Sequence, residues 1–213
     1  MTETDGAVVW QRVPQGWIEL VAFADDEVAD KWWEAYLAPG VDMVDTATLE
    51  RMTGAFHAMR DVVRGSRYAI AGVFPYLVDE PTLFFLGTTI IPSPETTSTA
   101  RNVAAFAGLV RLGDDMRTET FVSLDGRVGS ASLGTATTAD GTTVAAITSD
   151  VPLPGGAGTA FVVALSLDPD RLDELVPYAA LALDSTRLLG PDDTPPAYPP
   201  VSESNAGQPE SQA

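Results

Sequence analysis

Apolar side chains recur at helical spacing in the segment that runs from about Asp45 or Thr46 to Arg64. They fall within an arc of roughly 140° when successive residues are turned by 100°: Leu49, Met52, Ala55, Phe56, Met59, Val62 and Val63. This spacing predicts an amphipathic helix with one face packed on an apolar surface. Gly65-Ser66 is expected to end the helix.

A shorter helix is predicted between Asp25 and Ala38, since three acidic residues open this segment and Pro39-Gly40 follows it. Its apolar positions span roughly 200°, too wide an arc for a helix on one surface. Either the helix lies in a groove and is buried by neighbouring segments, or it offers an aromatic edge to a partner protein. Trp and Tyr are typical anchors of interfaces, so the partner hypothesis assigns the contact to Trp33 and Tyr36.

Alternating and β-rich segments predict an antiparallel sheet. Asp125-Gly126 and Asp140-Gly141 each separate two such segments, a pattern typical of β-hairpins. With the glycine-rich turn at 154–158 they predict a four-stranded meander, over about 118–124, 127–138, 142–152 and 159–167. Earlier strands are expected at Ala7–Val13, Trp17–Phe23, Tyr68–Phe74 and Thr82–Ile91. The first two are joined by a turn with Pro14 in its second position.

Two further helices are predicted, one in the Ala-rich segment Thr97–Leu112 and one after Asp168-Pro169-Asp170. Pro177 lies inside the second of these and is expected to kink or divide it. The resulting fold class is α+β: an antiparallel sheet with helices packed on it, in a single domain over residues 7–190. Residues 191–213 are rich in Pro, Ser and acids and are expected to form a disordered tail.

Charge excludes one class of partner. The chain has 30 acidic and 12 basic residues and a net charge of −18, and its arginines are scattered. Nucleic acids require clustered Lys and Arg, so we expect none as a partner. We also expect no membrane span, because no apolar run reaches about 18 residues. The acidic N-terminus lacks the features of a signal peptide, so a cytoplasmic location is expected. The preference for Arg over Lys together with the acidity fits a GC-rich, actinobacterial genome, and a salt-adapted organism would show the same composition.

Residue types that carry catalysis are scarce. The chain has no cysteine and one histidine, His57, which is expected on the helix face opposite the apolar stripe, beside Asp61. A hydrolase that uses His57 or a pair of carboxylates is the third function considered. Acidic clusters at 25–27, 114–115 and 168–174 lack the spacing of a calcium loop, and two of the three lie at predicted helix starts, so capping is the expected role. No metal and no cofactor are predicted.

The order of elements resembles that of a known group. The order begins with the turn segment Val13-Pro14-Gln15-Gly16-Trp17, followed by a Trp-containing helix and a helix rich in Met and Phe. A β meander comes next, and the order closes with a strand, an Asp-Pro pair and a helix. This order resembles small actinobacterial proteins, some associated with type VII secretion, which are similar to the Mog1/PsbP-like α/β sandwich. The resemblance covers roughly residues 7–189. It implies a cytoplasmic accessory or binding module and no catalytic residues.

Two functions follow from these observations. The first is a non-enzymatic interaction or accessory protein, whose acidic surface meets a basic patch on a partner protein. The alternative is a carrier or sensor of an apolar small molecule, held in a pocket between the sheet and the helices. This pocket is expected near Trp32, Trp33, Phe56 and Met59, since Met and large aromatic side chains suit an adaptable apolar site.

Overall fold

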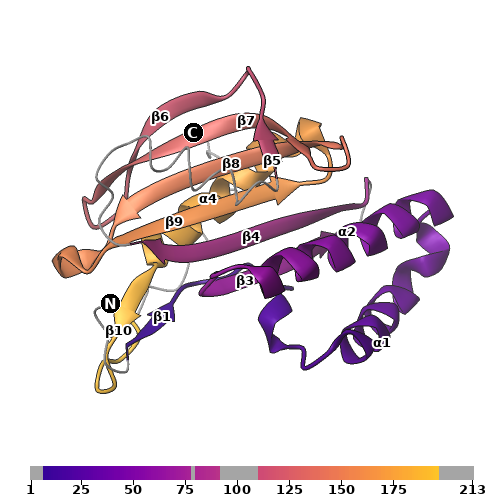
Figure 1. The fold of residues 1–213 in the computed structure, drawn as a ribbon, viewed down its shortest axis with the longest axis horizontal. Coiled ribbons are helices and arrows are strands. Elements are labelled where there is room, and N and C mark those ends of the chain that lie inside the picture. The colour runs from indigo at the N-terminus through magenta and orange to yellow at the C-terminus, as the bar shows by residue number, and fades with distance from the viewer. Residues whose placement is uncertain (1–6, 78–79, 92–109, 197–213) are drawn as a thin grey trace, which may run out of the picture.

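An antiparallel sheet forms the centre of the fold (Figure 1). The computed structural model describes residues 7–77, 80–91 and 110–196. Within these ranges the sheet has eight strands in the order β2-β3-β4-β9-β8-β7-β5, and β6 also pairs with β7. The bounds are β2 Ile18–Glu19, β3 Ile70–Tyr76, β4 Thr82–Ile91, β5 Val110–Leu112, β6 Arg117–Val122, β7 Val128–Thr138, β8 Thr143–Pro152 and β9 Thr159–Ser166.

The predicted meander is confirmed. Consecutive strands β6, β7, β8 and β9 pair antiparallel, with registers such as Leu133 opposite Ile147. Gly126 and Gly141 have φ angles of 81° and 88°, a backbone conformation that glycine adopts without strain. The Asp-Gly pairs therefore set the register of both hairpins.

Helices cover both faces of the sheet, so the α+β class is confirmed. The described residues contain three α-helices, α1 (Asp26–Leu37), α2 (Thr46–Gly65) and α4 (Leu172–Ser185). Because side chains alternate along a strand, neighbours in β4 belong to different cores. Phe85 packs in the core on the α1 and α2 side, and Phe84 packs in the core on the α4 side. The result is a sandwich of helices, sheet and helix.

Acidic residues begin these helices, as predicted. Asp25 and Asp45 accept hydrogen bonds from the backbone amides of Val28 and Thr48, each at 2.9 Å. Asp168 accepts from the amide of Asp170 at 3.0 Å, at the start of the short 3₁₀ turn before α4. The cluster at 114–115 differs, since it precedes a strand and Asp115 accepts from the amide of Thr135 in β7.

Two helix predictions need correction. Residues 110–112, expected at the end of a helix, form β5 and pair with β7, and residues 97–109 lie outside the described residues. Of the two effects expected of Pro177, division of the last helix is wrong, because α4 continues through it, and the kink stays a prediction. The missing Pro177 amide removes one hydrogen bond near the start of the helix, whereas Leu175, Ala179 and Leu183 hold it on the sheet.

The N-terminal strands are shorter than expected. β1 (Val8–Trp10) pairs with β10 (Arg187–Leu189), which the sequence did not predict. Residues 20–22, placed in a strand, form a 3₁₀ turn after β2. The turn before β2 is closed by the Trp17 amide on the Pro14 carbonyl at 3.2 Å, so Pro14 occupies its first position and Gly16, with φ 81°, its third. Residues 197–213 of the predicted tail lie outside the described residues.

An arginine holds the β6–β7 turn against the end of α4. The guanidinium of Arg127 donates to the Asp125 carboxylate at 2.7 Å. It also donates, at 2.9–3.4 Å, to the carbonyls of Asp184, Pro152 and Leu183. Arg187 donates to the other oxygen of Asp125 at 2.9 Å. We call this group (Asp125, Arg127, Arg187 and the carbonyls of Asp184, Pro152 and Leu183) the arginine clamp.

The clamp determines the protonation of Asp125. Burial is the largest influence on its pKa and raises it, but hydrogen bonds from Ser123 and Arg127 and the charges of Arg127 and Arg187 outweigh it. The pKa of Asp125 is thereby lowered from 3.8 to about 2. The carboxylate stabilises the fold above pH 4, and this contribution is lost as the pH falls through about 2.

Candidate functional site

A pocket of about 550 Å³ lies between α2 and the sheet. Its walls come from one side of α2, from β4 and β9, and from the hairpin that joins β7 to β8. Val110, the first residue of β5, completes it. The pocket therefore lies where α2 passes over the end of the meander.

Small residues on α2 leave this space open. Gly54, Ala55 and Ala58 all line the pocket, and a Cβ atom added at Gly54 would meet no atom within 4 Å. A glycine inside a helix costs about 1 kcal/mol relative to alanine. Gly54, which disfavours the helix, thus lies next to empty space and not at a close contact with another element.

The walls of the pocket are apolar. Met59 and Val62 of α2 face Phe85, Leu165 and Leu167 across it, and Val144 lies beside them. Tyr68 adds a phenol and packs edge-on against Phe85, with ring centroids 5.8 Å apart. Its ring lies over Gly87, where a Cβ atom would come within 2.6 Å of it. Burial raises the pKa of Tyr68, so the wall carries a neutral hydroxyl.

Apart from the Tyr68 hydroxyl, the polar side chains that line the pocket form a group that we call the polar rim: Arg51, Thr138, Asp140 and Thr142. Asp140 accepts hydrogen bonds from the Thr138 hydroxyl and from the amide and hydroxyl of Thr142, both at 3.2 Å. The bond from Thr138 is the largest of several causes that lower the pKa of Asp140, which therefore stays ionised at neutral pH. A ligand in this pocket would meet apolar walls and one cation and one anion at the rim.

The structure separates the residues that the sequence assigned to a pocket. Met59 lines it, but Phe56 lies in the core and is 0% exposed. Trp32 is 38% exposed and lies on the outer side of α1. Trp33 is 1% exposed, stacks on Phe56 with centroids 4.4 Å apart, and donates from Nε1 to the Thr53 hydroxyl at 2.9 Å. The side chain of Trp33 is thus inside the core and offers no surface to a partner, which corrects its assignment as a contact residue.

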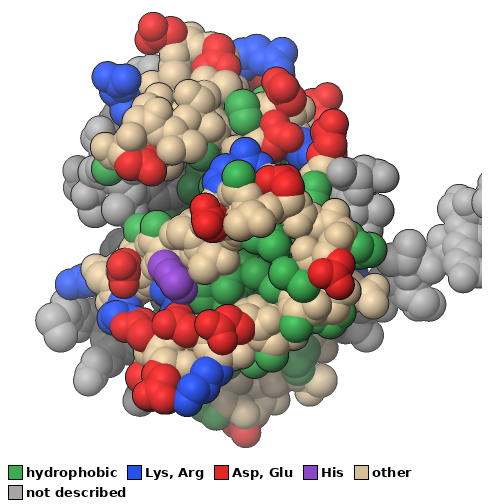
Figure 2. All heavy atoms as spheres, turned by 90° about the vertical axis from the view of Figure 1, so that its right-hand side faces the viewer, with side chains coloured by type: hydrophobic (Ala, Val, Ile, Leu, Met, Phe, Trp, Pro, Cys, Tyr) green, Lys and Arg blue, Asp and Glu red, His purple; other side chains and the backbone are tan. Residues whose placement is uncertain are grey.

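Aromatic side chains do reach the surface on the other side of α1. Trp32 stacks on Tyr36 at 5.2 Å and packs against Phe23 at 5.6 Å. Val28 is 48% exposed on the preceding turn of the helix. We call Phe23, Val28, Trp32 and Tyr36 the α1 aromatic surface. Figure 2, which views the molecule from the side of α1 and α2, shows hydrophobic side chains surrounded by acidic ones.

His57 is a surface residue, as predicted, but its partner differs. Its Nε2 lies 3.0 Å from the Asp30 carboxylate of α1, and the two side chains are 48% and 46% exposed. Asp61, the expected partner, lies 3.7 Å from Arg64 instead. In the part of the chain that the structure describes, no hydroxyl is hydrogen-bonded to His57, so the geometry of a nucleophile and its base is lacking.

No known family, characterised protein or solved structure matches this chain. The resemblance to Mog1/PsbP-like proteins therefore stays a prediction. Within the described ranges, no group of three or more His, Asp or Glu side chains could hold a metal ion. Of the helices described, none has the length and apolar character needed to cross a membrane. The site has to be interpreted from its own geometry.

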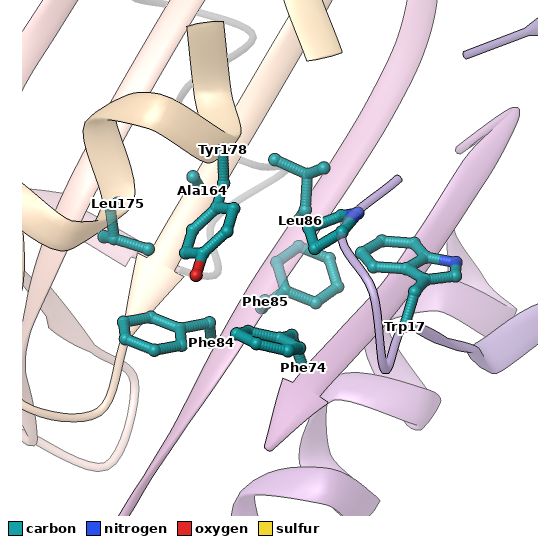
Figure 3. A pocket seen from close by; sticks show the side chains of 9 residues that line it. Trp17, Phe74, Phe84, Phe85, Leu86, Ala164, Leu175 and Tyr178 are labelled. Atoms are coloured by element: carbon teal, nitrogen blue, oxygen red, sulfur yellow. The ribbon is translucent and has the colours of Figure 1, made fainter. Parts of the chain in front are cut away.

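A second pocket, on the α4 side of the sheet, is too small for a ligand. Its volume is about 10 Å³, close to the space of one water molecule. Figure 3 shows the rings of Phe74, Phe84 and Tyr178 gathered around it, with centroids 5.3–6.0 Å apart. These rings fill the space themselves, so this pocket is a packing feature of the core.

Sequence reasoning missed most of the larger pocket. Tyr68, Phe85, Leu165 and Leu167 come from segments far apart in the chain, and only the pairing of β4 with β9 brings them together. One signal was available. Gly54 stands in the middle of a predicted helix, where a glycine is unfavourable unless space or a close approach requires it.

Proposed function

We propose that this protein binds an apolar small molecule in the pocket between α2 and the sheet, as a carrier or sensor. The observation that carries the proposal is the pocket of about 550 Å³ lined by Met59, Val62, Phe85, Leu165 and Leu167. Ligand sites of known proteins measure about 300–1,000 Å³ and have mostly apolar walls with a few polar groups. Water gains few hydrogen bonds from such walls, so an apolar ligand that displaces it is favoured.

A binding module agrees with the chemistry of the chain. The only histidine is paired on the surface with Asp30, and the sequence contains no cysteine. Met59 has several rotatable bonds and a polarisable sulfur, which adapts its shape to different apolar ligands. The resemblance to actinobacterial proteins implies a cytoplasmic setting for this activity.

Filling the pocket is expected to abolish binding. The probe is N-phenyl-1-naphthylamine, a neutral apolar dye whose fluorescence rises in apolar surroundings, titrated into the full chain. We expect saturable binding to the wild type, and a loss of at least about tenfold in affinity for Ala58→Trp and Gly54→Leu. Ala47→Trp, on an exposed position of α2 outside the pocket, serves as the matched control and should bind normally.

The Gly54→Leu variant separates a loss of binding from a loss of folding. Because leucine is a better helix former than glycine, the variant should be at least as stable as the wild type in urea denaturation. A loss of binding in a more stable protein therefore reports on the pocket and not on unfolding. Absence of saturable binding to the wild type, or equal binding by all four proteins, would contradict the proposal.

A second candidate function is supported by the α1 aromatic surface. Trp32, at 38% exposure, stacks on Tyr36 in the open, a combination typical of the anchors of interfaces. Helix α1 carries four acidic residues and one lysine. The occupant that fits this chemistry is a basic segment of a partner protein, with an apolar side chain between its positive charges.

The probe for this surface is a synthetic amphipathic helix of lysine and leucine, measured by isothermal titration calorimetry. We expect Trp32→Ala to weaken binding roughly tenfold or more, and added salt to weaken it further. Leu124→Ala, a variant of a side chain that is 91% exposed on the β6–β7 turn, is the control and should bind like the wild type. Equal effects of the two substitutions, or strong binding of the same peptide with glutamate for lysine, would rule out this surface.

A further inference from the structure

The polar rim contains one cation, Arg51. Five other arginines in the described ranges form ion pairs with carboxylates, whereas Arg67, Arg111 and Arg117 resemble Arg51 in forming none there; the five are Arg60, Arg64, Arg127, Arg171 and Arg187. Arg51 has no such ion pair within the described part of the chain, although the protein contains 30 acidic residues. It lines the pocket from the first half of α2, at an exposed position three residues before Gly54.

Asp140, the acidic group of the rim, already accepts hydrogen bonds from neighbouring residues. Asp140 accepts three hydrogen bonds from Thr138 and Thr142, all within its own turn. Asp140 and Arg51 both line the pocket but do not form an ion pair with each other. A positively charged ligand would have to compete with the threonine hydroxyls for Asp140, whereas a negatively charged one would meet a guanidinium that no described carboxylate pairs with.

We infer that the ligand is an amphipathic carboxylic acid, with its apolar body against Met59, Phe85 and Leu165 and its carboxylate beside the guanidinium of Arg51. This inference rests on the proposed function, because it names the chemical class of the molecule that the same pocket takes. A guanidinium and a carboxylate match in shape and form two parallel charge-assisted hydrogen bonds. The apolar walls supply affinity for the body of the ligand, and Arg51 selects its head group.

Three probes with the same chain and different head groups test this inference: decanoate, decanol and decylamine. Each is titrated below its micelle concentration into the full chain, by displacement of N-phenyl-1-naphthylamine. At neutral pH we expect decanoate to bind about tenfold more tightly than decanol, and decylamine to bind least tightly. Arg51→Gln should weaken decanoate about tenfold and leave decanol unchanged, because glutamine keeps a polar side chain without the charge.

Asp140→Asn provides an independent variant. Removing this negative charge from the rim should strengthen decanoate binding by a few-fold and leave decanol unchanged. The preference of the wild type for decanoate over decanol should also decrease in added salt, since Arg51 and Asp140 are both exposed to solvent.

The outcomes separate the two proposals. If decanol and decanoate bind equally well and Arg51→Gln changes neither, the pocket binds apolar molecules but the head-group assignment is wrong. If decylamine binds most tightly, Asp140 and not Arg51 selects the ligand, and the inference is overturned. If no probe displaces the dye because the dye itself does not bind, the proposed function fails first.

Discussion

Replacement of Trp33 by alanine is expected to lower the free energy of unfolding by about 3–5 kcal/mol. The indole is 1% exposed and stacks on Phe56, which is 0% exposed, so alanine would leave a large cavity in the core. The substitution also removes the hydrogen bond from Nε1 to the Thr53 hydroxyl. The loss is measured by urea denaturation at 25 °C, followed by far-ultraviolet circular dichroism.

The neighbouring tryptophan provides the control. Trp32→Ala removes the same side chain from a position that is 38% exposed, so we expect a loss of about 1 kcal/mol or less. Comparing the two variants also distinguishes a core role of Trp33 from a role in contacting a partner. If Trp33 were a contact residue, Trp33→Ala would weaken binding of a partner at nearly unchanged stability. Equal destabilisation by the two substitutions would show that the burial of Trp33 does not stabilise the fold as argued.

Loss of the arginine clamp is the second large expected effect. Arg127→Ala is expected to destabilise the protein by about 2–4 kcal/mol, because it removes the hydrogen bonds to Asp125 and to the carbonyls of Asp184 and Pro152. Arg187 still donates to Asp125 and to the Asp184 carbonyl but cannot replace all of these bonds. The side chain of Arg127 is only 11% exposed, so water replaces these bonds poorly. Urea denaturation at pH 7 measures the effect.

Arg117→Ala is the matched control, since Arg117 lies in the adjoining strand β6 and is exposed. Its loss should change stability by less than about 0.5 kcal/mol. The difference in the free energy of unfolding between the wild type and Arg127→Ala should also become smaller as the pH falls toward 2, where Asp125 becomes protonated in the folded state. A difference that is independent of pH would show that the ion pair with Asp125 contributes little.

The local elements of this fold are readable from the sequence. Asp25 and Asp45 mark the starts of α1 and α2 because a carboxylate there accepts an amide hydrogen bond that the helix leaves open. Gly126 and Gly141 mark the hairpins because their turns require positive φ angles. Such signals act over a few residues, so they are visible without knowledge of the fold.

Long-range pairing is not visible in the same way. β5 has only three residues, and it is a strand because β7 offers a partner to Val110 and Leu112, not because of its own sequence. The same holds for β10, whose partner β1 lies at the other end of the chain. Pro177 shows the reverse case, in which packing of α4 on the sheet outweighs a local preference against the helix.

The candidate site falls between these two cases. Helical spacing puts Met59 on the buried face of α2, and in the structure it lines the pocket between this helix and the sheet. Phe56 lies on the same apolar face of α2 and Trp33 lies on α1, yet both fill the core and neither lines the pocket. Whether two neighbouring elements pack together or leave a pocket depends on side chains from both. Leu165 and Val144 line the pocket together with α2, but this cannot be predicted before the strand order of the sheet is known.

The pairing of β1 with β10 also determines how the molecule responds to force. Val8 lies opposite Leu189, and Trp10 lies opposite Arg187, so the chain enters and leaves this two-stranded ribbon at the same end. Tension applied between the two ends would load the bonds of the ribbon one after another, as in opening a zipper, and not all at once. The ribbon is therefore expected to open at low force and to lengthen the molecule before the tension reaches α4 and the central sheet.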